Sequence, residues 1–274
     1  MLPGMSPVPA AHAGEPARSE LGAWIDLETR LLLAGAEERR HPDLCAWRDR
    51  KHPRVWDRHL ALALGPPVDP DEDVRALDAF YAETRVEQWS LLAPDGPWAE
   101  AWEDALVPLG LIAERELVLE KEARPDESGV EIDPALTLLE DPTALLGLVP
   151  LWRAVAEGTP GEAVVLDLVD LLRLRIAHGQ EVGVLAAREG GELIASIVLT
   201  VAGERAWLED LETRPDRRKR GHGRALMRAA EAVARRRGAR SLGLKALESD
   251  WPWQWYEREG FRVAGAYRRL RRLR

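Results

Sequence analysis

One stretch constrains the fold of this chain more than any other. It runs from Leu208 to Arg224 as LEDLETRPDRRKRGHGR and continues directly into ALMRAAEAVARRRG. The alternation over residues 206–213 predicts a strand that presents four side chains on one face: Trp207, Glu209, Leu211 and Thr213. After Arg224 the apolar side chains recur every three or four residues, which predicts a helix. A run of arginines followed by Gly238 marks the end of that helix.

The loop between this strand and this helix is suited to bind an anion. The first turn of a helix leaves backbone N–H groups unpaired, and the helix dipole favours negative charge there. Gly221 and Gly223 carry no side chain that would keep a phosphate away from the backbone. Between Arg214 and Arg240 there are eleven basic and two acidic residues, although the whole chain has a net charge of −9. This reversal of sign favours a polyanionic ligand. The alternative is a solvated basic turn with flexible glycines.

The surroundings of the loop resemble the GNAT superfamily of acyl-CoA-dependent N-acyltransferases. Arg218-x-x-Gly221-x-Gly223 is similar to the family signature Q/R-x-x-G-x-G/A. The strand segments ELIASIVLT and RSLGLKALES lie before and after it in the family's order, and WPWQWYEREGF is similar to the family's tyrosine-bearing helix. The resemblance covers roughly residues 130–270. It implies an α/β lobe, with a GNAT-type mixed sheet flanked by helices, that binds acetyl-CoA and no metal.

The resemblance also implies which residues meet the coenzyme. The loop and the helix start would hold the pyrophosphate on backbone N–H groups, and the end of the strand would pair with the pantetheine. If the strand splays there, a free N–H group can meet the thioester oxygen. The implied coenzyme-binding residues are Leu211, Glu212, Thr213, Arg218, Lys219, Arg220, Gly221, His222, Gly223, Arg224 and Ser249. Thr213 stands where the family usually has an aliphatic residue, and Ser249 lies where it often has an asparagine.

Two further residues are candidates for the chemistry. Tyr256 matches the family's general acid, since a phenol of pKa about 10 can protonate a thiolate whose thiol has a pKa of about 8.5. Glu209 matches a strand carboxylate that takes the amine proton. It is expected to share a face with Leu211, while Asp210 and Glu212 point the other way. The alternatives are an ordinary helix tyrosine and a solvated carboxylate, because family members without a dedicated base exist.

The length of 274 residues is sufficient for two domains, and a hydrophobic content of 46% is sufficient for their cores. The expected division is a disordered tail (1–19), an N-terminal lobe (20–122), a linker (123–129) and a catalytic lobe (130–274). No apolar run approaches the roughly 20 residues of a membrane span, so no membrane association is expected.

Two Pro-Trp segments suggest an internal repeat. PWAEAWEDALVPLGLIAERELVL and PWQWYEREGFRVAGAYRRL each predict a helix, a Gly-apolar junction and a closing strand. Aligning Gly110 with Gly260 places Leu106 opposite Tyr256. The repeat predicts that the N-terminal lobe is a degenerate GNAT-like lobe, since it has no R-x-x-G-x-G. An unrelated domain of helices and strands is the alternative.

Three other features bear on compartment and partners. Cys45 is the only cysteine in the sequence, which indicates an inert thiol in a cytoplasmic protein. The arginines of the terminal RRLRRLR are expected to be solvated or to pair with the acidic N-terminal lobe, because the net charge argues against a nucleic-acid partner. Among Trp251, Trp253 and Trp255, at least one is expected to line a cleft or the interface between the lobes.

The predicted function is transfer of an acetyl group from acetyl-CoA to a primary amine of a small molecule or peptide. The alternatives are a CoA-binding pseudoenzyme or ligand sensor without turnover, and a relative that transfers aminoacyl or peptidyl groups. The two lobes are expected to form a pseudo-dimer within a monomer or loose homodimer. The sequence does not name the acceptor.

Overall fold

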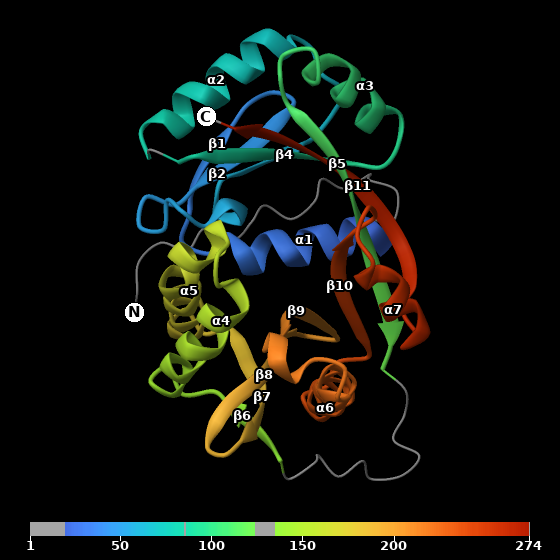
Figure 1. Ribbon diagram of the computed structural model, residues 1–274. Helices are drawn as coiled ribbons and strands as arrows, with labels where there is room; N and C mark the ends of the chain where they lie inside the picture. The colour runs from blue at the N-terminus through green and yellow to red at the C-terminus, as the bar shows by residue number, and fades with distance from the viewer. Residues whose placement is uncertain (1–19, 85, 124–134, 274) are drawn as a thin grey trace, which may run out of the picture.

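The computed structural model describes residues 20–84, 86–123 and 135–273 (Figure 1). The predicted tail lies outside these residues, as does all of the predicted linker except Ala123. Within the described residues, eleven strands form one continuous sheet in the order β1-β2-β3-β4-β11-β5-β10-β9-β8-β7-β6. Helices pack on this sheet, which makes the mixed α/β fold that the sequence predicts.

The elements from α1 to β5 are called the N-lobe. They are α1 (Glu20–Leu32), β1 (Glu37–Arg40), β2 (Leu44–Arg48), the 3-10 turn η1 (Trp56–Arg58), β3 (Leu60–Ala63), α2 (Pro70–Ala82), β4 (Gln88–Pro94), α3 (Pro97–Leu106) and β5 (Ile112–Glu122). α3 and β5 are the helix and closing strand predicted from the first Pro-Trp segment. The edge strands β1 and β2 were not predicted, because the exposed EERR of β1 has no apolar face.

The elements from β6 to β11 are called the C-lobe. They are β6 (Leu136–Leu139), η2 (Ala144–Gly147), α4 (Leu148–Ala156), η3 (Pro160–Val164), α5 (Val165–Ala177), β7 (Glu181–Glu189), β8 (Glu192–Ala202), β9 (Arg205–Thr213), η4 (Pro215–Arg217), α6 (His222–Arg236), β10 (Ser241–Leu247), α7 (Pro252–Arg258) and β11 (Arg262–Leu273). Apart from the short 3-10 turns, the order is strand, two helices, three strands, helix, strand, helix and strand, and it contains the predicted strand–loop–helix as β9 and α6.

The two lobes repeat one topology. In each, an antiparallel meander leads to a strand that pairs in parallel with the next strand across a helix: β3 and β4 across α2, and β9 and β10 across α6. A second helix and a closing strand follow in both lobes. The internal repeat suggested by the Pro-Trp segments therefore corresponds to equivalent elements, α3–β5 and α7–β11.

The closing strands are exchanged between the lobes. β5 of the N-lobe pairs with β10, and β11 of the C-lobe pairs with β4, while β5 and β11 pair with each other at the centre of the sheet. The arginines of β11 consequently meet N-lobe carboxylates: Arg268 with Glu103 at 2.6 Å, Arg271 with Glu114 at 2.7 Å and Arg272 with Asp78 at 3.4 Å. Of the two expectations for the basic terminal segment, solvation or pairing with the acidic N-terminal lobe, the structure shows the pairing.

Helix α1 lies across the junction of the lobes (Figure 1). Its Trp24 is fully buried, packs on Trp207 of β9 with ring centroids 5.9 Å apart, and donates a 2.7 Å hydrogen bond from Nε1 to Glu120 of β5. A Cβ at Gly243 would lie 2.6 Å from the Trp24 ring. Residue 243 must therefore be glycine for α1 to cover β10 at this distance.

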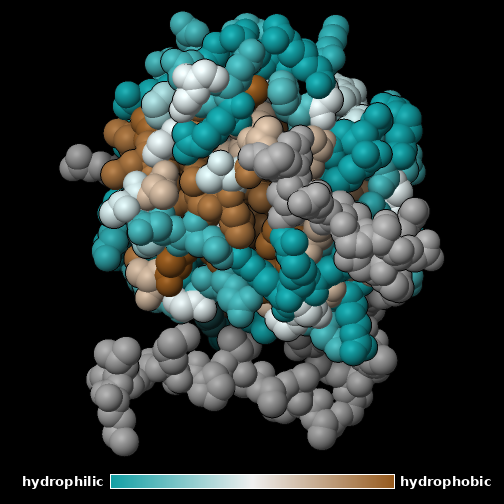
Figure 2. Space-filling model, turned by 90° about the horizontal axis from the view of Figure 1, so that it is seen from below, coloured by the Kyte–Doolittle hydropathy of each residue, from teal (hydrophilic) through white to brown (hydrophobic). Residues whose placement is uncertain are grey.

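The surface is hydrophilic around most of its outline when seen from below, with apolar residues gathered near the centre of that face (Figure 2). Beneath the surface, α6 buries its apolar side against β8 and β9, with Leu226, Ala230 and Val233 in the core. This packing fixes the start of α6 relative to the end of β9. In the described part of the chain, no helix has both the length and the apolar character needed to cross a membrane.

Candidate active site

The strands β9 and β10 separate at the centre of the C-lobe. They pair in parallel over only three residue pairs, the last being Trp207 with Gly243, although β9 continues to Thr213 and β10 to Leu247. Beyond this point the facing edges of the two strands no longer bond to each other. β9 and β10 are therefore separated along Leu211–Thr213, which is the condition for free N–H groups at this segment.

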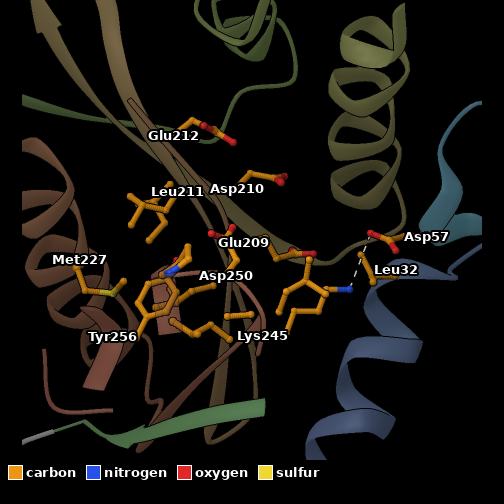
Figure 3. A pocket seen from close by; sticks show the side chains of 16 residues that line it. Leu32, Asp57, Glu209, Asp210, Leu211, Glu212, Met227, Lys245, Asp250 and Tyr256 are labelled. Carbon is orange, nitrogen blue, oxygen red and sulfur yellow. Dashed lines mark ion pairs between the residues drawn. The ribbon is translucent and has the colours of Figure 1, made fainter. Parts of the chain in front are cut away.

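A cavity of about 340 Å³ opens between the separated strands (Figure 3). Both lobes line it, together with α6 and α7. The lining residues are Leu32, Asp57, Ile197, Leu208, Glu209, Asp210, Leu211, Glu212, Met227, Leu244, Lys245, Ala246, Leu247, Asp250, Pro252 and Tyr256. The structure therefore brings the predicted Tyr256 and Glu209 to one cavity, along with Leu211 and Glu212.

A β-bulge at Asp210 changes which side chains share a face. Val198 of β8 is opposite Glu209 and Ser196 is opposite Glu212, so two residues of β9 stand where β8 has one. Asp210 adopts a positive φ of 48° at this point. Glu209 and Glu212 consequently lie on one face, whereas Leu211 packs on the α6 side. The predicted grouping of Glu209 with Leu211, apart from Glu212, was wrong because one extra residue inverts the alternation.

Glu209 is held by an arginine. Nη1 of Arg175 on α5 donates to Oε2 of Glu209 at 2.9 Å, and Nη2 donates to Oγ1 of Thr200 at 2.6 Å. The Arg175 side chain is 6% exposed and that of Glu209 is 13% exposed, so the pair is largely shielded from water. The carboxylate of Glu209 is therefore already engaged by Arg175 and is held in place by it.

Among the carboxylates that line the cavity, Asp210 and Glu212 have raised pKa values. Asp210 is exposed and lines the cavity, and Glu209 and Glu212 lie nearby. Desolvation and then the charges of these two neighbours raise the pKa of Asp210 to about 7. Burial also raises the pKa of Glu212. Sequence reasoning missed Asp210 because the bulge that turns it toward the cavity has no signal in the sequence.

Tyr256 lies on α7, on the side of the cavity near Met227 (Figure 3). Its ring packs against Trp255 and Phe261, with centroids 5.1 and 6.0 Å away. Burial, followed by the charges of Glu212 and Asp210, raises the pKa of Tyr256 to about 12. The phenol therefore keeps its proton at neutral pH, as a general acid must.

The loop after β9 ends in an open helix start. Gly221 has a φ of +86° and caps α6, whose first backbone bond runs from the N–H of Ala225 to the carbonyl of Gly221 at 3.0 Å. The N–H groups of His222, Gly223 and Arg224 precede any intrahelical acceptor. Arg218 folds back, so that its Nε donates to the Thr213 carbonyl at 3.1 Å. The predicted anion-binding loop thus adjoins the end of β9.

Backbone strain is concentrated at this site. In the described part of the chain, the non-glycine residues with positive φ are Asp210 (48°) and Lys219 (62°). One lies at the cavity and the other in the basic loop. Left-handed conformations cost a non-glycine residue about 1–2 kcal/mol, and such strain is typically found at functional sites.

Gly223 connects the loop to the cavity walls. A Cβ at this position would lie 3.8 Å from the Trp255 ring and 4.0 Å from Leu211, which are ordinary contact distances. Trp255 of α7 therefore packs against the start of α6, and none of Trp251, Trp253 and Trp255 is among the residues that line the cavity. Trp251 is 65% exposed. Ser249 lies exposed in the turn after β10, and no contact shows a role for it.

The lobe junction beneath the cavity is built from charges. Lys245 of β10 contacts Glu28 of α1 at 2.6 Å and Asp57 of η1 at 3.8 Å. Arg269 of β11 contacts the same Asp57 at 2.7 Å and Glu116 of β5 at 3.4 Å. Two C-lobe cations are thus shared among three N-lobe carboxylates. These pairs fix the N-lobe wall of the cavity against β10.

Comparisons with known proteins agree with this geometry. Residues 152–261, which contain β9, the basic loop, α6 and α7, match the model of the acetyltransferase (GNAT) family. A comparison with curated protein sequences gives no match. The solved structures discussed next are less than 25% identical in sequence and show similarity of fold alone.

Three solved structures resemble nearly the whole chain. A functionally unknown conserved protein from Staphylococcus epidermidis has a TM-score of 0.67 at 10% identity, over 89% of this chain and 97% of that chain. A GCN5-related N-acetyltransferase from Kribbella flavida has a TM-score of 0.59 at 20% identity, over 93% and 96%. A tandem GNAT protein from the clavulanic acid biosynthesis pathway has a TM-score of 0.55 at 14% identity, over 92% and 94%. A region of the C-lobe, residues 152–261, thus matches the GNAT acetyltransferase family, and the whole chain resembles these solved structures in fold.

Proposed function

We propose that the protein transfers an acetyl group from acetyl-CoA to a primary amine. One observation carries this proposal. A single cavity holds Asp210, with its raised pKa, and Tyr256, at the point where β9 and β10 separate and beside the open start of α6. Direct acyl transfer from a thioester needs a proton acceptor, a proton donor and an anion site in this relation.

The residues of the loop fit the coenzyme. The unpaired N–H groups at the start of α6 are suited to a pyrophosphate, and the exposed side chains of Arg218, Lys219 and Arg220 add positive charge around it. Space around Gly221 is open, since a Cβ there would meet no atom within 4 Å. The free edge of β9 from Leu208 onward would receive the pantetheine as an added strand, and its N–H groups would meet the thioester oxygen.

We assign the general base to Asp210 and keep Glu209 as the residue that, with Arg175, positions the strand. The ionised carboxylate of Asp210 accepts the proton of the attacking amine. The amine nitrogen forms a bond to the acetyl carbon, and the carbon–sulfur bond breaks. The products are an amide and the free thiol of CoA, because Tyr256 gives its proton to the departing sulfur.

The order of the two proton transfers follows from their coupling. The charge of Asp210 is one of the causes that raise the pKa of Tyr256. When Asp210 takes up the amine proton, that charge disappears and the phenol becomes a stronger acid. Protonation of the base therefore prepares the acid for the sulfur.

We further propose the following organisation. Residues 20–122 are a degenerate lobe, 123–129 are a linker and 130–274 are the catalytic lobe, and the exchange of β5 and β11 makes the two lobes a pseudo-dimer. A reducing compartment such as the cytoplasm is supported by Cys45, whose thiol is buried and has a pKa raised to about 12. Such a thiol is inert.

The test combines binding and turnover. Calorimetry with CoA is expected to give one site per chain, and thiol release from acetyl-CoA in the presence of a panel of amines is expected to depend on the amine. Tyr256→Phe is expected to lower the rate by about 100-fold or more with CoA affinity unchanged. Binding of CoA without thiol release would instead identify a sensor, and failure to bind CoA would overturn the proposal.

A further inference from the structure

The cavity has two ends of different character (Figure 3). Leu211, Met227 and Tyr256 lie together at one end, where the proposed function places the thioester. Leu32 and Asp57 lie at the opposite end and belong to the N-lobe, since Leu32 is the last residue of α1 and Asp57 lies in η1. The acceptor must reach the thioester from the end that the coenzyme does not fill. The lobe without the R-x-x-G-x-G loop therefore forms the wall that the acceptor meets.

Among the three carboxylates at the lobe junction, Asp57 is the most exposed. Its side chain is 40% exposed, against 5% for Glu28 and 8% for Glu116, which share Lys245 and Arg269 with it. Although burial opposes ionisation, the charges of Lys245 and Arg269 hold the pKa of Asp57 below its usual range. An ionised carboxylate is thus presented to the cavity on a firmly held element.

The single cation among the described lining residues does not balance this charge. Lys245 contacts both Glu28, whose Oε1 is 2.6 Å from Nζ, and Asp57 at 3.8 Å. Together with Arg269 it is shared among Glu28, Asp57 and Glu116, so these groups carry one more negative than positive charge. Asp210 and Glu212 lie farther along the same cavity. A negative group on the acceptor would lie among carboxylates, whereas a positive group would be stabilised, and like-charge contacts of this kind are a general means of excluding wrong partners.

We propose that the N-lobe forms the acceptor end of the cavity and that Asp57 is its specificity-determining residue, selecting a primary amine whose tail is cationic over one whose tail is anionic. The inference rests on the proposed function, because that function places the coenzyme at the other end. The chemical class that fits is a short aliphatic diamine.

Three probes of similar length separate the effect of tail charge: 1,4-diaminobutane, n-butylamine and 4-aminobutanoate. Their binding to the CoA-saturated full chain is measured by calorimetry, which needs no turnover. We expect the diamine to bind about tenfold more tightly than butylamine, and 4-aminobutanoate to bind at least about tenfold more weakly than butylamine. Equal affinities, tighter binding of 4-aminobutanoate, or no binding of the diamine would overturn the inference.

Two variants test the residue itself. Asp57→Asn is expected to reduce the preference for the diamine over butylamine by about tenfold, while Leu32→Lys, a cation on the same wall, is expected to move the preference toward 4-aminobutanoate. Glu181→Gln, at an exposed position of β7 outside the cavity, is the matched control and should change nothing. If Asp57→Asn weakens the lobe junction, Leu32→Lys still tests whether the charge of this wall determines the preference among the three amines. A diamine preference that neither variant alters would contradict the role of Asp57.

Failure of the inference and failure of the proposed function are distinguishable. A charge preference in binding, without thiol release from acetyl-CoA, would refute the function and leave the acceptor subsite standing. Thiol release that proceeds equally with all three amines would retain the function and refute the selectivity.

Discussion

The helices α2 and α6 occupy equivalent places in the two lobes but begin in opposite ways. α6 starts at a left-handed glycine after a basic loop, and its first N–H groups face outward. α2 starts at Asp69, whose Oδ1 accepts a 3.0 Å hydrogen bond from the N–H of Glu72, and Pro70 removes another donor. Three acidic residues fill its first turn. The same topology therefore presents an anion site in one lobe and a closed, negatively charged cap in the other.

The regions beside these two helices also differ, since the one in the N-lobe is filled by side chains and the one in the C-lobe is open. In the N-lobe, Trp102 and Leu106 of α3 are fully buried, and Nε1 of Trp102 donates to the Gly65 carbonyl at 2.8 Å. In the C-lobe, Tyr256 of α7 faces a cavity instead. Both lobes thus share the apolar layers of the fold, whereas the site depends on a few polar residues and on space left unfilled.

The largest effect is expected from separating the lobes. In an isolated 130–274 fragment, β11 would lose both neighbours, β4 and β5, and would expose the buried Tyr267 and Leu270. We expect no cooperative unfolding transition by circular dichroism and no affinity for CoA. Mixing the fragment with a separately expressed 20–122 fragment serves as the control and should restore both. A fragment that unfolds cooperatively and binds CoA alone would show that the lobes are independent.

The next largest effect concerns pH and separates Asp210 from the other carboxylates. Its raised pKa of about 7 reflects desolvation and the charges of Glu209, Glu212 and Asp57, partly offset by Arg175 of α5. The base is present only above this pKa. The ratio of kcat/KM for wild type to that for Asp210→Asn should therefore rise about tenfold per pH unit below 7 and level off above it. At the plateau we expect a ratio of about 100 or more.

Using the ratio removes the titration of the acceptor amine, which affects both proteins equally. Glu209→Gln is the comparison variant. We expect it to retain a midpoint, shifted below that of the wild type, because the charge of Glu209 is one of the causes that raise the pKa of Asp210. If the midpoint in the pH dependence of kcat/KM disappeared in Glu209→Gln and persisted in Asp210→Asn, Glu209 rather than Asp210 would be the base.

A smaller effect is expected at the open helix start. Gly223→Ala adds a methyl group that the structure accommodates, at 3.8 Å from Trp255. Alanine is the better helix former, so stability toward urea should be unchanged or higher by up to about 1 kcal/mol. CoA affinity should nevertheless fall about tenfold, because the methyl group lies where the pyrophosphate approaches.

Gly221→Ala is the matched control for this substitution. Its φ of +86° makes any side chain strained, at a cost of about 1–2 kcal/mol of stability, although no neighbouring atom would be met. The two variants therefore separate a glycine needed for the ligand from a glycine needed for the backbone. An unchanged CoA affinity in Gly223→Ala would argue against pyrophosphate binding at this helix start.

Periodicity and turn residues predicted most of this fold, including the strand–loop–helix from Leu208 onward and the repeat that matches α3 with α7. Those features are local, because each depends on neighbours along the chain. The bulge at Asp210, the exchange of β5 with β11 and the N-lobe wall at Asp57 depend on contacts between distant segments. The single-residue register shift was enough to misassign the faces of Glu209 and Glu212, and hence to miss the better candidate base.

The smallest expected effect tests whether the cap of α2 is a structural substitute for a ligand. Asp69→Ala removes the carboxylate that accepts from Glu72 and should cost about 1 kcal/mol in urea unfolding, whereas Asp69→Gly should cost only a few tenths. Neither should alter the affinity or the stoichiometry of CoA, because Trp102 and Leu106 still fill the adjacent cleft. A second CoA site in Asp69→Ala would mean that the carboxylate alone closes the N-lobe. If both variants bind CoA at one site per chain, the filled cleft alone is sufficient to prevent CoA binding in the N-lobe. Packing as well as charge would then distinguish the N-lobe from the C-lobe.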